Sequence, residues 1–356
     1  MKTRILATIL LLLFTTAAQA QVKTFEDGRS AKGVSSKTLI PKLASGQAYS
    51  ERYTFSALLS DGSDFYLEMT ISNFGWGDHS AATATRLELA GHSPYADKQT
   101  MDKDEWSFNK SKFQMTMGRS SVEVVKEGQY RVRHTGDVEY DLIFKNILPS
   151  WRPGSGEIRA DGDFFRLGLI APRASVTGRV KIDGKWVDVT SRQGMADWSV
   201  TTIAPFDLAK QFGRFRATRG DTYVAWRSIK LSEDLGGEEV VWVMVGKGNK
   251  IIFEDASATI EKRALKKDKR SGYNVPYEVV IRGSDGGQVL ELTLENPGRY
   301  QVSDLLDSYG SVTRFLAQRF TKPFQFNANV KWRLNIKGDS PLELNGRGPL
   351  GMDILN

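Results

Sequence analysis

Turn signals recur along the chain at short, regular intervals, and this feature most constrains its fold. Each signal separates two short runs in which apolar and polar residues alternate, as in DFYLEMTISNF and QVLELTLEN. Alternation with a period of two is typical of strands that bury one face. The signals are Asp61-Gly62, Glu127-Gly128, Asp161-Gly162, Asp183-Gly184, Gly220-Asp221, Gly236-Gly237, Gly248-Asn249 and Gly286-Gly287. No alternation of strands with long helices is visible, so the sequence predicts an all-β protein of antiparallel sheet and excludes a parallel α/β fold.

The number of alternating runs predicts two barrels rather than one. We expect roughly 16 strands, whereas a barrel of about eight strands already encloses side chains and one small ligand. The predicted organisation is therefore an N-terminal barrel over residues 21–175 and a C-terminal barrel over residues 176–356.

Residues 303–320 break the strand pattern. Their apolar residues recur at steps of three or four, which predicts one helix in the C-terminal domain. Ser303 is a suitable N-cap, and Pro323 ends the pattern. A helix packed on a sheet is the favoured interpretation, and a helix lying on a membrane surface is the alternative.

The N-terminus has the pattern of a secretory signal peptide. Lys2 and Arg4 precede the apolar run ILATILLLLF, and Ala18-Gln19-Ala20 fits the small-x-small cleavage rule. We therefore expect residues 1–20 to be removed and the mature protein to be periplasmic or secreted. An uncleaved N-terminal membrane anchor is the alternative.

The composition excludes several kinds of chemistry. The chain has no cysteine, which removes thiol catalysis and thiolate metal sites. Its three histidines (His79, His92 and His134) have no metal-ligand spacing, so we predict no metal and no cofactor. The formal net charge is +7, and the export signal together with the absence of a nucleic-acid-binding motif argues against a nucleic-acid partner.

A basic cluster occupies residues 266–270, in the sequence KKDKR. A solvated loop is the simple interpretation. A patch in transient contact with an anionic membrane surface is the alternative, because basic residues near anionic lipid each gain about 1 kcal/mol.

Asp197 is the lone acid of the apolar stretch GMADW. A buried carboxylate is costly unless it is paired, so we expect a partner, with Arg173 and Arg192 as the candidates. The structural hypothesis is an ion pair between the two domains. The functional hypothesis is a general acid whose proton is retained by desolvation.

The tryptophans give the second set of candidate site residues, because most lie in or beside predicted strands. Ordinary packing is one interpretation, and the lining of an apolar ligand site is the other. The predicted ligand-binding residues are Trp76, Trp151, Arg173, Met195, Trp198, Trp226 and Trp242.

Three stretches resemble the survival-factor family and its carotenoid-hydratase-like (AttH-like) bacterial relatives. They are YDLIFKNILPSWRPGSG followed by FFRLGLIAPRASVTGRVKIDGKWVDVTSRQGMADW, then VSDLLDSYGSVTRFLAQRFTKPFQF, and finally NGRGPLGMDIL. The resemblance implies two lipocalin-like (calycin) barrels in tandem that meet around residues 172–200. It also implies binding of sphingolipid-type molecules, or chemistry on polyenes and terpenoids as in the hydratases, tocopherol cyclases and fungal pericyclases of similar architecture. Where hydratase-like relatives carry an Asp-His pair, this chain has Asp197 followed by Trp198.

These observations lead to a functional hypothesis and two alternatives. The hypothesis is a secreted or periplasmic carrier that binds a lipid or another long apolar molecule, sphingolipid-like or isoprenoid-like. The first alternative is an acid-catalysed hydratase, cyclase or isomerase of a terpenoid or polyene, with Asp197 as proton donor and Trp198 or Trp226 stabilising positive charge. The second is a structural envelope protein whose barrels are packed solid.

Overall fold

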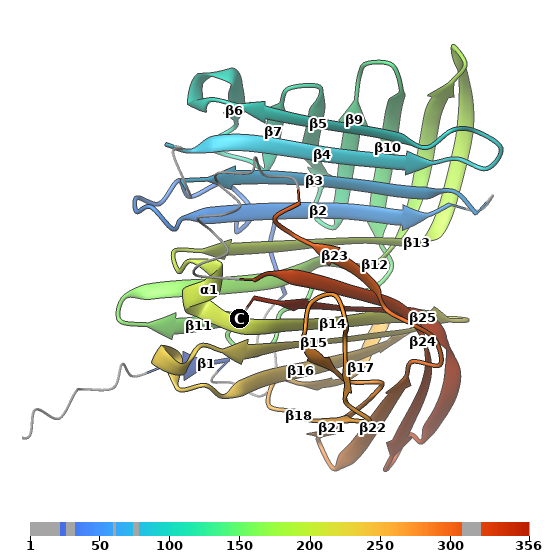
Figure 1. The fold of residues 1–356 in the computed structure, drawn as a ribbon. Helices are drawn as coiled ribbons and strands as arrows, with labels where there is room; N and C mark the ends of the chain where they lie inside the picture. The colour runs from blue at the N-terminus through green and yellow to red at the C-terminus, as the bar shows by residue number, and fades with distance from the viewer. Residues whose placement is uncertain (1–21, 26–32, 60–61, 74–77, 308–321, 356) are drawn as a thin grey trace, which may run out of the picture.

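The computed structural model describes residues 22–25, 33–59, 62–73, 78–307 and 322–355 (Figure 1). The predicted signal peptide and Trp76 lie outside the described residues. The regular elements are strands, apart from α1 (Pro205–Leu208) and the short 3-10 helices η1 (Lys103–Glu105) and η2 (Glu233–Leu235). The prediction of an all-β protein is confirmed.

The first sheet contains thirteen strands, in the order β5-β4-β3-β2-β13-β12-β10-β9-β8-β7-β6, with β11 beside β12 and β1 beside β11. Their bounds are β1 Lys23–Thr24, β2 Ser50–Leu58, β3 Asp64–Ser72, β4 Ser80–Glu88, β5 Tyr95–Met101, β6 Trp106–Phe108, β7 Gln114–Met117, β8 Ser120–Lys126, β9 Gln129–His134, β10 Glu139–Asn146, β11 Glu157–Ala160, β12 Asp163–Ile182 and β13 Lys185–Thr201.

The second sheet contains ten strands, in the order β17-β16-β15-β14-β25-β24-β22-β21-β18, with β23 beside β24. Their bounds are β14 Ala209–Arg219, β15 Thr222–Leu231, β16 Glu239–Lys247, β17 Lys250–Asp255, β18 Thr259–Arg263, β21 Glu278–Asp285, β22 Gln288–Glu295, β23 Gln301–Asp304, β24 Phe324–Lys337 and β25 Leu342–Ile354. A separate hairpin pairs β19 (Lys266–Lys267) with β20 (Asn274–Val275). The two sheets thus hold more strands than the eight expected in each.

The local sequence accounts for the pairing. In β3 buried and half-buried residues alternate without interruption, as the period-two pattern requires. Between β12 and β13, Asp183 and Gly184 both have positive φ, at 48° and 78°. This is the conformation that a two-residue type I′ turn requires at both central positions. The turn joins Ile182 to Lys185 as the predicted hairpin.

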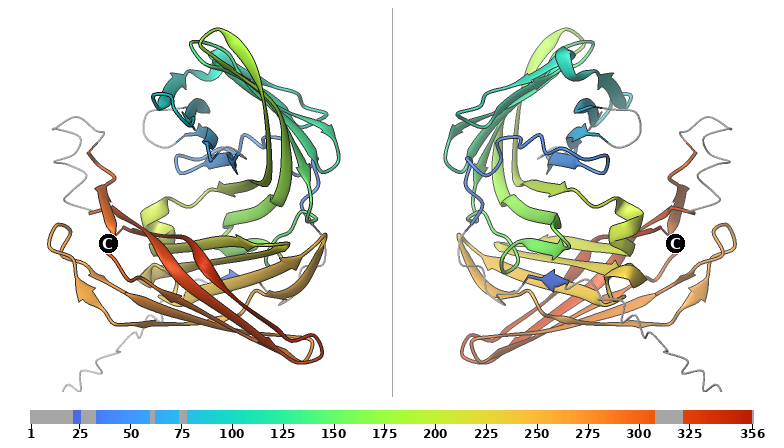
Figure 2. Two further views of the ribbon diagram at one scale, coloured as in Figure 1. Left: turned by 90° about the vertical axis from the view of Figure 1, so that its right-hand side faces the viewer. Right: turned by 90° about the vertical axis from the view of Figure 1, so that its left-hand side faces the viewer.

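The first sheet curls into a nearly closed barrel, which is the upper ring in Figure 2. Strands from the two ends of the sheet order meet there. The backbone N–H of Arg119, just before β8, donates to Oε1 of Gln99 on β5 at 3.0 Å. The indole N–H of Trp106 on β6 donates to the carbonyl of His79, just before β4, at 2.8 Å. These contacts enclose an apolar interior lined by large aromatic side chains, among them Phe55, Phe65, Tyr130 and Phe144.

The second sheet also curls until its ends approach, and it forms the lower, wider curve in Figure 2. The backbone N–H of Ser284 on β21 donates to Oδ2 of Asp255, the last residue of β17, at 2.8 Å. The backbone N–H of Glu254 donates to Oδ2 of Asp285 at 3.1 Å. Its interior is a second core, separate from that of the first barrel.

The division between the sheets falls later in the chain than the predicted division at residues 175/176. That position lies inside β12, which continues to Ile182 and pairs with β13 in the first sheet. The second sheet begins at Ala209, after α1. The tight Asp183-Gly184 turn explains the difference, because it folds β13 back against β12 and so keeps both strands in the first sheet.

The predicted helix at residues 303–320 is not supported where its residues are described. Ser303 and Asp304 belong to β23 and pair with Gln325 and Phe324 of β24. Pairing with the edge of β24 gives hydrogen-bond partners to backbone N–H groups that would have none in the first turn of a helix. Residues 308–321 lie outside the described part of the chain.

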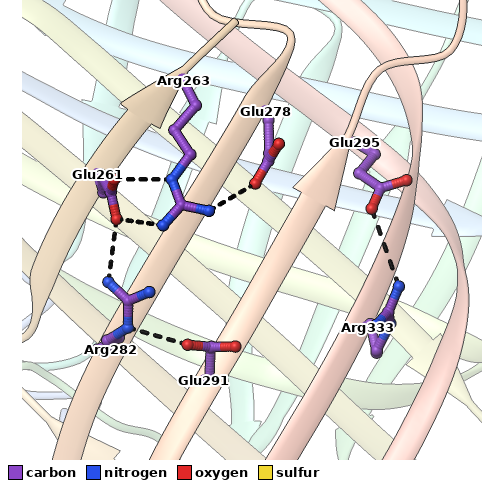
Figure 3. Close-up of polar contacts among 7 residues, drawn as sticks. All are labelled: Glu261, Arg263, Glu278, Arg282, Glu291, Glu295 and Arg333. Carbon is purple, nitrogen blue, oxygen red and sulfur yellow. Dashed lines mark hydrogen bonds and ion pairs between the residues drawn. The ribbon is translucent and has the colours of Figure 1, made fainter.

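The outer face of β18, β21 and β22 carries charges that pair across the strands (Figure 3). Glu261 accepts hydrogen bonds from Arg263 at 2.6 Å and from Arg282 at 3.1 Å, and Arg263 also donates to Glu278 at 3.0 Å. The hydrogen bonds from Arg263 and Arg282 lower the pKa of Glu261 to about 2. These pairs are exposed, so solvent and salt screen them, and the face is that of a solvated sheet.

Candidate functional site

Asp197 lies between the two barrels. On β13 its neighbour Trp198 points into the first barrel, so the alternation of the strand directs Asp197 outward toward the second sheet. There Oδ2 of Asp197 accepts a hydrogen bond from Nη2 of Arg227 on β15 at 2.8 Å, and the side chains are 15% and 24% exposed. The structure thus pairs Asp197 with Arg227, and not with the expected candidates Arg173 or Arg192.

The surroundings of Asp197 keep it ionised. Burial alone would raise the pKa of this carboxyl group. The positive charges of Arg227, Arg52 and Arg216 outweigh burial and lower the pKa below its ordinary value. An ionised carboxylate with a fixed cation holds the domains together but has no proton to donate.

Arg173, which was predicted to bind ligand, instead contacts the backbone of the second domain. Its residue is 5% exposed on β12. Nη1 donates to the carbonyl of Asp221 at 2.7 Å, and Nη2 donates to that of Gly220 at 3.1 Å. Both carbonyls belong to the β14–β15 turn, so Arg173 fixes one hairpin of the second sheet against the first barrel. Arg192 contributes its backbone carbonyl, which accepts from Arg173 Nε at 3.3 Å.

Three other predicted residues meet in the apolar core between the barrels. Trp151 and Trp242 lie with ring centroids 5.0 Å apart, and Met195 packs against the same cluster. The Trp151 indole N–H donates to Oε2 of Glu254. The guanidinium of Arg227 lies 5.9 Å from the ring of Trp242, so the Asp197–Arg227 ion pair adjoins the Trp151–Trp242 aromatic pair. We call the contact region between the barrels, which contains these two pairs, Met195 and Arg173, the joint.

Trp198 lies inside the first barrel, beside an acid that the sequence reasoning did not select. Its indole N–H donates to Oε1 of Glu51 at 2.8 Å. The Glu51 residue is fully buried. Burial is the largest influence on its carboxyl group and raises its pKa, although hydrogen bonds from Tyr53, Tyr49 and Trp198 oppose the shift.

Trp226 lies inside the second barrel, in a layer of aromatic rings. Its cross-strand partner Phe215 has its ring centroid 6.4 Å from that of Trp332 on β24. Within the described residues, no hydrogen-bond partner is present for Nε1 of Trp226, Nε1 of Trp332 or Oγ of Ser228. Buried polar groups usually have partners, so a water or a polar ligand atom is expected near each of these groups.

A cavity of about 360 Å³ opens at one end of the second barrel, and we call it the cup. It lies where the β16–β17, β21–β22 and β24–β25 turns come together. Its lining residues are Lys247, Ile252, Gln288, Ile336, Ser340, Pro341 and Leu342. The volume lies within the range of small-molecule sites, which are mainly apolar with a few polar groups that orient the ligand.

The aromatic layer lies below the cup. Thr222, which pairs with Lys247, and Ile336 mark the cup end of the barrel. Trp226 and Trp332 each lie four residues further along the same strands, or about 13 Å at about 3.3 Å per residue. Apolar side chains of the second core fill the space between.

The predicted site residues therefore do not form one pocket. Trp151, Trp242 and Met195 belong to the joint, as do Asp197 and Arg173, whereas Trp198 and Trp226 point into different barrels. Glu51 could have been found from the sequence, because it occupies an inward position between Tyr49 and Tyr53 in an alternating run. No local sequence pattern identifies the cup residues, because they lie at or beside three turns that are far apart in the sequence and meet only in the folded barrel.

The described residues contain no group of three or more histidine, cysteine, aspartate or glutamate residues that could hold a metal ion. They also contain no helix that is long and apolar enough to cross a membrane.

Comparison with known proteins identifies the fold. No family model matches the chain, and no curated protein matches it in sequence. Among solved structures, CghA in complex with Sch210972 superposes with a TM-score of 0.62 at 12% identity, over 93% of this chain and 95% of that one. Kievitone hydratase from Nectria haematococca gives 0.53 at 9% identity, over 93% and 98%. An AttH candidate from Nitrosomonas europaea gives 0.53 at 14% identity, over 86% and 92%.

The chain has the double lipocalin-like fold. The resemblance to AttH-like proteins is thereby confirmed at the level of the fold, and both barrels are included because the superpositions cover most of each chain. At these low sequence identities the similarity shows the fold only. The roles of individual residues must be argued from the geometry of this chain.

Proposed function

We propose that this double lipocalin-like protein binds a lipid or another long apolar molecule in the cup of the second barrel. The lining of the cup is the main support for this proposal. It combines apolar side chains with one cation, Lys247, and two neutral polar side chains, Gln288 and Ser340. Ile252, Ile336 and Leu342 would contact an apolar chain, and the ammonium group of Lys247 would face an acidic end group. This pattern favours an amphiphile such as a fatty acid over a fully apolar hydrocarbon.

Replacing Leu342 with arginine tests the proposal, because it puts a charge into the wall of the cup. Leu342 is half-buried, so the added charge would lose water mainly when an apolar chain covers it; we expect binding of a fluorescent fatty acid to weaken about tenfold, or about 1.4 kcal/mol. Fluorescence titration of the purified protein measures the change.

Val289→Arg is the matched control. Val289 is 54% exposed on β22, near the same end of the barrel but outside the cup, so this variant should bind as the wild type does.

Lys247→Gln should weaken binding of the fatty acid by about threefold, as expected for an exposed ion pair, and leave binding of the matching alcohol unchanged. A wild-type protein with no saturable binding, or equal affinities for Leu342→Arg and wild type, would contradict the proposal.

The alternative function, acid-catalysed chemistry on a terpenoid or polyene, required Asp197 as proton donor. The ion pair with Arg227 and the lowered pKa disfavour that role. We therefore propose binding without proton transfer at Asp197, in which case Asp197→Asn retains its ligand.

We also propose export of the protein to the periplasm or the medium, on the pattern of residues 1–20. Expression of the full chain in a Gram-negative host should give a soluble product that begins at Gln21. Intact mass and cell fractionation measure this, and a cytoplasmic product that retains Met1 or Lys2 would contradict it.

A further inference from the structure

Glu51 occupies the most enclosed polar position in the first barrel. Its carboxyl group has four hydrogen-bonding neighbours and no exposed surface. Oε1 lies 2.7 Å from Oη of Tyr53 and 2.8 Å from the indole N–H of Trp198. Oε2 lies 2.7 Å from Oη of Tyr49 and 3.2 Å from the backbone N–H of Lys42.

The number of protons in this cluster determines the state of Glu51. Oη of Tyr53 is 2.7 Å from Oε1 of Glu51 and also 2.7 Å from the carbonyl oxygen of Leu39, which can only accept. A tyrosine hydroxyl has one proton, so it cannot donate to both oxygens. If Glu51 is protonated, it donates to Tyr53, Tyr53 donates to Leu39, and every contact is satisfied. If Glu51 is ionised, one close oxygen–oxygen contact has no proton.

The surroundings of Glu51 supply no compensating charge. Tyr49 and Tyr53 are the titratable side chains in contact with it, and both have pKa values raised by burial and by Glu51 itself. His79 lies behind Tyr49, with ring centroids 5.6 Å apart; its Nδ1 pairs with Asp78, and its Nε2 lies 3.1 Å from the carbonyl oxygen of Ala44, so it does not contact Glu51. No lysine, arginine or histidine side chain of the described residues pairs with Glu51. An isolated buried carboxylate is strongly disfavoured and retains its proton instead.

The cluster holds a segment that crosses one end of the first barrel. We call residues 34–46 the strap. At one side Ser36 bonds to Glu127 in the β8–β9 turn, with Oγ to Oε2 at 2.7 Å. At the other side, the carbonyls of Ala44 and Gly46 accept from Nδ2 of Asn73, just after β3, at 3.3 and 2.9 Å. Strands β3 and β8 lie in different halves of the sheet order, so the strap spans the barrel end.

The centre of the strap depends on the Glu51 cluster. Leu39 and Lys42 are bonded to Tyr53 and Glu51, and the N–H of Leu43 donates to Oη of Tyr49 at 3.2 Å. The Leu39 side chain is fully buried in the first core. Loss of the cluster would therefore free the strap between its two ends.

We infer that Glu51 is a neutral carboxylic acid and acts as a proton-dependent latch that holds the strap across the end of the first barrel. The closed state binds one proton at Glu51, whereas the open state exposes an ordinary glutamate with a pKa of about 4.3. The latch is at full strength below that pH. It weakens as pH rises toward the raised pKa of the closed state.

Hydrogen exchange of the Lys42 and Leu43 amides in the full-length mature protein tests the latch. Corrected for the intrinsic pH dependence of exchange, their protection factors should fall about tenfold per pH unit above about pH 4.3, until Glu51 titrates in the closed state. In Glu51→Gln they should not depend on pH in this way, because the amide is neutral throughout and its NH₂ group can donate to Tyr53. Infrared difference spectra should show a protonated carboxyl band that persists above about pH 4.3 and that Glu51→Gln lacks.

Glu68→Gln is the matched control. Glu68 accepts from Oη of Tyr66 at 2.7 Å on the outer, partly exposed face of the same barrel. This variant should keep both the carboxyl band and the pH-dependent protection. A Glu51 carboxyl group that titrates near pH 4.3 in the folded protein would overturn the inference. So would protection of Lys42 and Leu43 with the same pH dependence in wild type and Glu51→Gln.

Discussion

Replacing Trp242 with alanine is expected to lower the free energy of unfolding by about 3–5 kcal/mol, the range for a large aromatic residue removed from a core. Trp242 is 1% exposed on the outer face of β16 and contacts Trp151 of the first domain. Its loss leaves a void between the barrels that rigid sheets close poorly. Chemical denaturation followed by circular dichroism measures the change.

Trp186→Ala is the control, because Trp186 is 41% exposed near the tip of the β12–β13 hairpin. That variant should change stability by less than about 1 kcal/mol. The Trp242→Ala protein should also be cleaved faster by protease in residues 202–208, which connect the two sheets. A loss below about 1 kcal/mol for Trp242→Ala would show that the barrels do not depend on this contact.

Replacing Arg227 with methionine should destabilise the protein by about 3 kcal/mol at neutral pH, because it leaves the Asp197 carboxylate largely buried without its hydrogen-bonded partner. The sign of the pH dependence follows from the lowered pKa of Asp197. The pair stabilises the folded state above the ordinary aspartate pKa of about 3.9. This contribution is lost as pH falls through the lowered pKa, so the two proteins should converge in strong acid. Urea unfolding at several pH values measures the difference.

Arg131→Met is the matched control for the ion pair. Arg131 also forms a hydrogen-bonded pair with Asp141, at 2.8 and 2.6 Å, but its side chain is 38% exposed on the first barrel. We expect a loss of less than about 1 kcal/mol. Equal losses for Arg227→Met and Arg131→Met would mean that the position of the pair between the domains adds no stability.

Much of the fold could be predicted because β-structure has a local signature. The alternation in DFYLEMTISNF became the regular burial pattern of β3, and Asp183-Gly184 formed the expected turn. The start of the helix predicted at 303–320 was wrong, since apolar residues at steps of three or four do not exclude an edge strand at 303–304, and residues 308–321 lie outside the described part of the chain. Ser303 and Asp304 found backbone partners on β24 that no local pattern indicates.

The site was harder to predict, because its members lie on different strands. Asp197 was recognisable as an acid that needs a cation, but two arginines close in sequence were preferred to Arg227. Residues near each other in a hairpin often point to opposite faces, whereas Arg227 reaches Asp197 because β15 packs across β13. Trp151, Trp198, Trp226 and Trp242 were likewise recognisable as candidates for buried positions. Their separation into the inter-barrel core and the two barrel interiors depended on strand alternation and on which sheet each strand joined.

The sequence by itself determined the all-β class, the hairpins and the presence of two barrels, because turn chemistry and period-two alternation act between neighbouring residues. The tertiary structure alone decided the pairing of Asp197 with Arg227, the cup at the end of the second barrel and the enclosure of Glu51 beneath the strap. These features depend on the curvature of the sheets, which brings distant turns together and removes water from particular side chains. Burial and partner geometry then set the charge of Asp197 and the proton on Glu51.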